Sequence, residues 1–152
     1  MMLEYYRLRP DVKPPTRANP SDAGLDLIFN PADGNSITLG VGDSAILATG
    51  YKFGIPHGYM LQIMNRSGMA AKRSLIVGAH VVDSGYDGEV FVNLHNIGND
   101  PQTINPGDKI AQGVVIPVVA VRFLEAGDEN LYGWHPITIS DRGDGALGST
   151  GQ

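Results

Sequence analysis

The chain has 152 residues, 42% of them apolar, and a formal net charge of -5 at neutral pH. This length allows one domain with a substantial core, and the negative charge argues against a nucleic-acid coat or a membrane-surface protein. There is no cysteine for disulfides or thiolate metal sites, and no apolar stretch of signal-peptide length. We therefore expect a soluble, cytoplasmic protein that binds neither nucleic acid nor membrane.

Twenty glycines and ten prolines punctuate the chain. Turn signals spaced by about 8–12 residues are typical of an all-β sandwich or barrel. The pattern predicts a strand over residues 3–8 and a proline-rich connector over 10–20. It then predicts strands over 36–39 and 44–55 on either side of a turn at 40–43.

The middle of the chain alternates clearly between apolar and polar residues. Residues 59–65 predict a strand with Leu61 and Ile63 on one face. Residues 89–95 predict a second such strand, in which the inward side chains are Val90, Val92 and Leu94. The outward side chains of that strand are Glu89, Asn93 and His95.

The last apolar run covers residues 109–121, and we expect Pro117 to divide it into two strands. Only residues 68–74 look helical. From residue 127 onward the chain is polar and rich in glycine. The sequence therefore predicts an all-β domain over 1–126 with one short helix, followed by a flexible C-terminal arm.

Two polar side chains interrupt apolar runs. Asp26 lies within Ala-Gly-Leu-Asp-Leu (23–27) and is either a buried structural carboxylate or a site residue. Gln112 ends Pro-Gly-Asp-Lys-Ile-Ala-Gln (106–112), and a buried amide there needs hydrogen-bond partners. For both residues the structural and the functional interpretation stay open.

The segment Asn-Arg-Ser-Gly-Met (65–69) lies where a predicted strand meets the predicted helix. Ser67 is placed to cap that helix. A helix N-terminus with Arg66 beside it is also able to hold an anion. The cap and the anion site are both consistent with these residues.

Residues 81–89, Val-Val-Asp-Ser-Gly-Tyr-Asp-Gly-Glu, predict a β-hairpin because two β runs flank a turn rich in glycine and aspartate. Asp83 and Tyr86 would lie near its tip. A plain turn explains the glycines and Asp87, but it does not explain a tyrosine between two glycines.

The last eleven residues, 142–152, begin with Arg142 and contain four glycines and the pair Ser149–Thr150. Ordering such a segment costs roughly 1–2 kcal/mol per residue, which a ligand would have to offset. Its backbone N–H groups, guanidinium and hydroxyls suit a polyanion such as a triphosphate. The alternative is a frayed polar terminus.

Taken in order, these five segments resemble the five motifs of the homotrimeric dUTPase family, and the resemblance spans residues 23–151. It implies a jelly-roll-like β-barrel or sandwich that forms a homotrimer with three shared active sites. Residues 127–152 would then complete an active site of a neighbouring subunit. The implied reaction is hydrolysis of dUTP to dUMP and pyrophosphate with Mg²⁺.

The resemblance also implies roles for individual residues. Asp83 would contact the sugar 3′-OH and act as general base for the water that attacks the α-phosphorus. Gln112 would contact that water and a phosphate, and Asp26 would act near the metal through water. Tyr86 would lie under the deoxyribose, where an added 2′-OH would clash.

The remaining implied contacts are to the base and the phosphates. The backbone from Gly78 to Val82 would read the uracil edge and exclude a thymine methyl group. The implied phosphate and arm contacts are Arg66, Ser67, Gly68, Arg142, Leu147, Gly148, Ser149 and Thr150.

Three positions depart from the family pattern. Leu147 replaces an aromatic residue that usually stacks on uracil, and such stacking is worth roughly 1–3 kcal/mol, so we expect weaker arm closure and a higher KM. Ala146 replaces a usual glycine. His80 replaces a small residue, and it either faces solvent or touches the base.

Two other functions are compatible with parts of this sequence. A dCTP deaminase would need a catalytic glutamate near position 93, where an amide such as Asn93 cannot shuttle protons. A non-catalytic trimer that binds nucleotide or a partner would have no need for the intact set of Asp83, Gln112 and Arg142.

Overall fold

The computed structural model of the chain describes residues 1–129 and 131–134. It contains one compact unit, Met1–Ala120, and a second unit, Val121–Gln152. In the described part of the second unit the regular structure is a single 3-10 turn, Leu131–Gly133. None of the described helices is both long enough and apolar enough to span a bilayer.

The body is built from four antiparallel sheets. The largest has the order β2-β11-β6-β8, formed by Leu25–Ile28, Lys109–Pro117, Tyr59–Met64 and Val81–Val82. The second has the order β4-β9-β7, formed by Ser44–Ala48, Phe91–Asn96 and Leu75–Val77. Two smaller sheets pair β1 with β5 and β3 with β10, formed by Glu4–Arg7, Tyr51–Gly54, Ile37–Leu39 and Gln102–Ile104.

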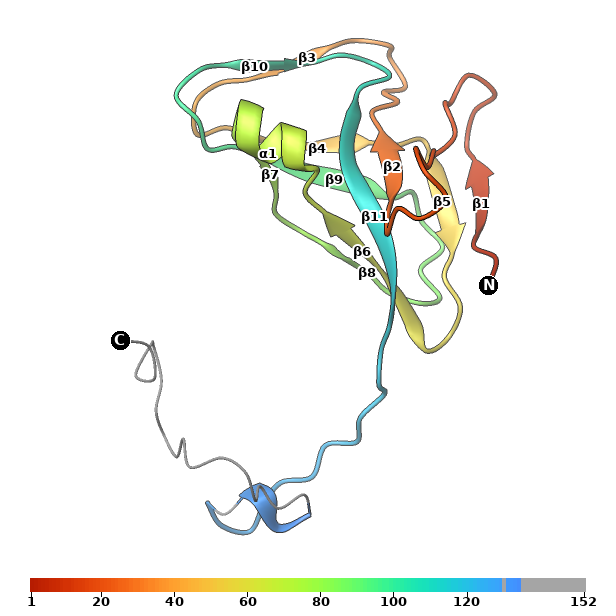
Figure 1. Cartoon of the computed structure of the whole chain (residues 1–152), viewed down its shortest axis with the longest axis vertical. Helices are drawn as coiled ribbons and strands as arrows, with labels where there is room; N and C mark the ends of the chain where they lie inside the picture. The colour runs from red at the N-terminus through yellow and green to blue at the C-terminus, as the bar shows by residue number, and fades with distance from the viewer. Residues whose placement is uncertain (130, 135–152) are drawn as a thin grey trace. The chain divides into compact units, whose positions relative to one another are not determined.

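The two larger sheets form the layers of a sandwich, and Figure 1 shows β11 passing in front of β9. Within the described residues the sheets do not close into a barrel. The predicted all-β, jelly-roll-like class with one short helix is confirmed in its sandwich form.

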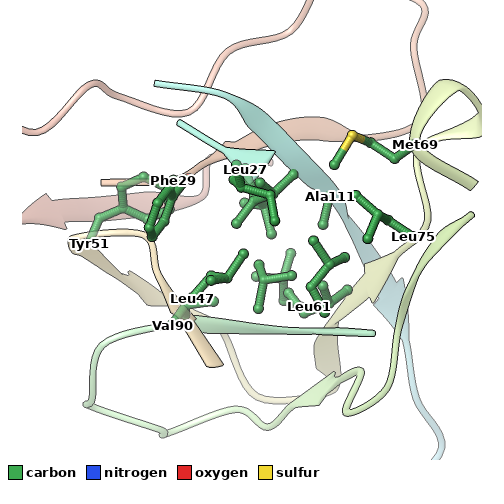
Figure 2. Packing of buried hydrophobic residues seen from close by; sticks show 14 of the residues in the cluster. Leu27, Phe29, Leu47, Tyr51, Leu61, Met69, Leu75, Val90 and Ala111 are labelled. Atoms are coloured by element: carbon green, nitrogen blue, oxygen red, sulfur yellow. The ribbon is translucent and has the colours of Figure 1, made fainter. Parts of the chain in front are cut away.

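One continuous apolar core lies between these layers. Figure 2 shows Leu27 and Ala111 pointing toward Leu47, with Met69 at one end of the cluster and Tyr51 at the other. Full burial of such a side chain stabilises the fold by about 1.5–3 kcal/mol. The predicted inward positions are confirmed, since all five are buried: Leu61, Ile63, Val90, Val92 and Leu94.

The single α-helix, α1, spans Ser67–Arg73 and buries Met69. Its cap is Arg66, in extended backbone conformation and without a side-chain capping bond, so the predicted cap at Ser67 is wrong. The Arg66 side chain bonds instead to Asp26, and Ser67 is the first helical residue. Ser74 ends the helix in the left-handed conformation.

The predicted strand over 44–55 is two strands, β4 and β5, which belong to different sheets. Gly50 separates them with a φ of 75°, a conformation that side chains disfavour. The apolar run after residue 109 gives only one strand in the described chain, because β11 ends at Pro117 and nothing regular follows before the turn at Leu131. The short strands β2, β7 and β10 were not predicted.

The predicted hairpin over 81–89 is also corrected. β8 pairs with β6, whereas β9, the strand after the turn, pairs with β4 and β7. The segment therefore carries the chain from one layer of the sandwich to the other. Local alternation identifies a strand but not its partner, since pairing depends on distant segments.

Candidate functional site

Three of the five sequence motifs meet at one cleft of about 350 Å³. In the register of the largest sheet, Gln112 of β11 pairs with Asp26 on one side and Met64 on the other. Residues Asn65 and Arg66 follow Met64 directly and lead into α1. The cleft is lined by Asp26, Arg66, Ser67, Gly68, Lys109 and Gln112, among others.

Asp26 pairs with two cations at the wall of this cleft. Its Oδ1 lies 2.9 Å from Arg66 Nε, and its Oδ2 lies 2.8 Å from Lys109 Nζ. The Asp26 side chain is only 14% exposed, while both partners reach further into solvent. We call the whole cleft the cationic cleft, because the ion-paired group of Asp26, Arg66 and Lys109 lies at its wall.

Two further contacts fix the polar side chains around the cationic cleft. Gln112 donates from Nε2 to the Asn65 carbonyl over 2.8 Å, and Arg66 donates from Nη1 to the Lys109 carbonyl over 3.3 Å. Gly24 is required beside Gln112, because a Cβ there would lie 2.7 Å from Gln112 Oε1. The amide is thus satisfied by hydrogen bonding and also faces the cleft.

Asp83 and Tyr86 line a separate hollow of about 240 Å³, together with Val82 and Glu89. We call residues 83–88 the tyrosine loop. Asp83 is exposed, and in the described part of the chain no group donates to its carboxylate. The tip of the loop is a tight turn, in which the Tyr86 N–H donates to the Asp83 carbonyl over 3.3 Å.

The ring of Tyr86 is held in place although it is 46% exposed. Its hydroxyl donates to the Glu89 carbonyl over 2.9 Å. A Cβ at Gly88 would overlap that hydroxyl and ring, so the tyrosine packs directly on the glycine backbone. This contact requires Gly88, while Gly85 adopts a φ of 80°, a left-handed conformation that favours glycine.

The comparison with known proteins identifies the chain. A family model described as dUTPase matches residues 11–151. The chain belongs to the dUTPase family.

Relatives named deoxyuridine 5'-triphosphate nucleotidohydrolase support this assignment. The protein from Mycolicibacterium gilvum is 39% identical over 152 residues, covering 98% of this chain and 94% of its own. The protein from Gloeobacter violaceus is 38% identical over 139 residues, covering 90% and 88%. The predicted family and enzyme class are confirmed: the chain is a dUTP diphosphatase.

Solved structures of family members share the fold. The Staphylococcus bacteriophage 80alpha dUTPase with dUpNHpp has a TM-score of 0.84 at 22% identity, and the match covers 99% of both chains. A variant of the dUTPase from phage phi11 of S. aureus has a TM-score of 0.76 at 22% identity, covering 86% of this chain and 99% of its own. That second structure is described as showing the coordination of a structural Mg(II) ion.

The dUTPase motifs of this chain divide into three groups. The cationic cleft brings together Asp26, Arg66, Ser67, Gly68 and Gln112. The tyrosine loop and its flank hold Val82, Asp83 and Tyr86 in another hollow, and Gly78 lines neither of the two. The predicted arm residues Arg142, Ala146, Leu147, Gly148, Ser149 and Thr150 lie outside the described residues.

Sequence reasoning missed Lys109 as a site residue. A β-bulge between Lys109 and Ala111 shifts the register of β11 against β2, and the Lys109 ammonium then reaches Asp26. Bulges turn a side chain away from the face that alternation predicts. No local pattern in the sequence around Lys109 indicates the bulge.

Proposed function

We propose that the chain hydrolyses dUTP to dUMP and pyrophosphate by attack of water on the α-phosphorus, with Asp83 as general base. The observation that carries this proposal is the register of β11, which gathers three family motifs around one cluster of cations. Strong charge-assisted bonds to phosphate oxygens are the ordinary use of such a cluster.

The cationic cleft would bind the triphosphate. Arg66 and Lys109 supply positive charge, and Ser67, Gly68 and Gln112 supply further polar contacts beside them. Asp26 orients both cations before substrate arrives, and orientation of charge ahead of reaction is a major source of catalysis in phosphoryl transfer.

Asp83 would take the proton of the attacking water. Its carboxylate is exposed and accepts no hydrogen bond from described residues, so it is available to a water or a sugar hydroxyl. A positioned general base typically contributes about 10²–10⁴-fold to the rate. Tyr86, fixed on Gly88, would form the floor under the deoxyribose and exclude a 2′-OH.

The residues fit Mg²⁺ only as an ion held mainly by substrate phosphates. Both carboxylate oxygens of Asp26 are already paired with cations, and the described residues contain no group of three or more potential metal ligands. Mg²⁺ commonly retains waters and binds through phosphates, so Asp26 would contact it through water. The ion would supply charge neutralisation on the triphosphate.

We further propose that three chains form the enzyme and share its active sites. The cationic cleft and the tyrosine loop line different hollows, so a site that uses both would combine two subunits. The arm, residues 127–152, would complete a site of a neighbouring subunit with Arg142, Leu147, Gly148, Ser149 and Thr150. A cytoplasmic location without nucleic-acid or membrane partners stays a prediction from the sequence.

The test is release of pyrophosphate from dUTP, dCTP, dTTP and UTP, with and without Mg²⁺. We expect turnover of dUTP alone, and only with the cation. Turnover of dCTP with release of ammonia would instead indicate a deaminase. No release from any nucleotide would contradict the proposed reaction.

Sharing of sites is tested by mixing two inactive variants, Asp83→Asn and Arg66→Ala, after unfolding and refolding them together. If each site combines both residues from different chains, mixed trimers regain some intact sites and activity returns. Activity that stays absent in mixed trimers would place both residues in one subunit's site.

A further inference from the structure

We infer that Asn93 and His95 of β9 are positioning residues that hold the backbone of residues 78–80 and thereby set the selectivity for uracil. This inference rests on the proposed function, in which the backbone from Gly78 to Val82 reads the base. Neither side chain was assigned a role from the sequence beyond an outward direction on its strand.

Residues 78–80 connect β7 to β8 and cross between the two layers of the sandwich. The Gly78 N–H donates to the Asn93 carbonyl over 2.8 Å. The Ala79 N–H donates to the Asn93 side-chain oxygen, Oδ1, over 3.3 Å. A side chain on a neighbouring strand therefore restrains a peptide that no β-ladder restrains.

His95 orients the amide of Asn93. The His95 Nε2 lies 2.9 Å from Asn93 Oδ1, and because an oxygen only accepts, this ring nitrogen carries the proton. Oδ1 then accepts two hydrogen bonds, one from Ala79 and one from His95, which matches its two lone pairs. The amide oxygen is thus fixed toward the connection.

Side-chain packing also restrains the backbone at Gly78. A Cβ built on Gly78 would overlap Asn93 Oδ1 and the His95 ring, so both side chains fill the space next to the glycine. At the other end of the connection, the Ile63 N–H of β6 donates to the His80 carbonyl over 2.8 Å. The His80 ring itself is exposed, with Nδ1 3.1 Å from the Gly78 carbonyl.

Two backbone groups of the connection stay available. Among the described residues, no hydrogen bond reaches the Ala79 carbonyl or the His80 N–H. The two groups belong to one trans peptide and point in opposite directions, so only one of them can face the base. If the Ala79 carbonyl faces the base, it would accept from uracil N3–H, and displaced by one ring position it would accept from cytosine N4–H. Selectivity therefore depends on where the connection is held, and Asn93 and His95 hold it.

The test compares Asn93→Ala, which removes both the acceptor and the Nδ2 donor to the Ala45 carbonyl, with Asn93→Asp, which loses that donor but keeps an oxygen for Ala79 and His95. For Asn93→Ala we expect the KM for dUTP to rise by about tenfold, which is the size of effect that loss of one hydrogen bond produces. We expect kcat to stay within about twofold of the wild-type value. The ratio of kcat/KM for dCTP to that for dUTP should rise by a similar factor. For Asn93→Asp, both the KM for dUTP and this ratio should stay close to the wild-type values.

The matched control is Thr38→Ala. Thr38 is an exposed residue on a strand, and its replacement removes one side-chain hydrogen bond, to Thr103, but Thr38 lies outside both clefts. It should change neither KM nor the dCTP ratio. An unchanged KM and ratio in Asn93→Ala, or an equal change in Thr38→Ala, would overturn the inference.

Amide hydrogen exchange gives a readout that does not need activity. Exchange at Ala79 should accelerate in Asn93→Ala and His95→Ala but not in Asn93→Asp. Unchanged exchange at Ala79 would refute the restraint even if catalysis changed. If the wild type failed to hydrolyse dUTP while Ala79 exchange still depended on Asn93, the proposed function would fail and the restraint would stand.

Discussion

The cationic cleft and the tyrosine loop treat their charged groups in opposite ways. In the cleft, Asp26 is nearly buried and both of its oxygens are paired with cations. In the loop, the Asp83 carboxylate is exposed and accepts no bond from the described residues. The same side-chain type is thus fixed by ion pairs in one region and left accessible to solvent in the other.

The physical basis of this difference is the local scaffold. Asp26 of β2 is in register with β11, which supplies Lys109, and the chain leaving β6 on the other side of β11 supplies Arg66. Asp83 follows a strand of only two residues and enters a turn between the layers. A turn exposes its side chains to solvent, where a carboxylate can exchange partners readily.

The largest effect should come from Asp83→Asn. Removing the proposed base should lower kcat by about 10²–10⁴-fold while binding of a non-hydrolysable dUTP analogue changes little. Steady-state kinetics and calorimetric titration measure the two quantities. A variant with nearly normal kcat would show that Asp83 is not the base.

Asp26→Asn should act mainly on stability and on phosphate binding. It leaves two neighbouring cations without their counterion, so the free energy of unfolding should fall by about 1–3 kcal/mol and the KM should rise. The matched control is Asp87→Asn, because Asp87 pairs with Lys52 but is 86% exposed. Exposed pairs contribute about 0–1 kcal/mol, so urea unfolding should separate the two variants.

Gly88→Ala should displace the Tyr86 ring, the proposed floor under the deoxyribose, without altering a charged group. The added methyl group must displace the Tyr86 ring, so the ratio of kcat/KM for UTP to that for dUTP should rise by about tenfold. Gly54→Ala is the control, since a Cβ there meets only ordinary contacts, the nearest at 3.6 Å. Retention of full sugar selectivity would show that Tyr86 does not set it.

The smallest expected effect is on the free energy of unfolding at high pH, and it comes from Tyr51. The Tyr51 hydroxyl accepts a hydrogen bond from the Ile28 N–H of β2, the strand that carries Asp26. Burial raises the pKa of the Tyr51 hydroxyl well above its usual range, and the charge of Asp26 raises it further, while the hydrogen bond from the Ile28 N–H opposes the shift. The folded chain therefore keeps this proton after the unfolded chain has lost it.

The sign follows from this proton difference. Below about pH 10 both states are protonated and the contribution of Tyr51 is constant; above it, stability falls by up to about 1.4 kcal/mol per pH unit. Urea unfolding at pH 9 and pH 11 should show a steeper decline for the wild type than for Tyr51→Phe. Parallel declines would mean that Tyr51 does not titrate in this way.

Much of the fold was predictable because its signals are local. The two-residue period assigned Leu61, Ile63, Val92 and Leu94 to the core, and all are buried. The short helix was found within one residue at each end. The strands β2, β7 and β10, each of three or four residues, were not predicted.

The site was predictable to a different extent. Motif order identified the family, and three motifs do meet at one cleft. The role of Lys109 was not predictable, because it depends on a bulge in β11. The contacts of Asn93 and His95 with residues 78–80 were not predictable either, since they join separate strands.

The sequence by itself determined which side chains face inward and which family the chain belongs to, because alternation and motif order are properties of neighbouring residues. Only the tertiary structure decided that β8 pairs with β6 and that Asp26 holds two cations. Those outcomes depend on contacts between segments far apart along the chain, where the register of one strand against another selects which polar groups meet.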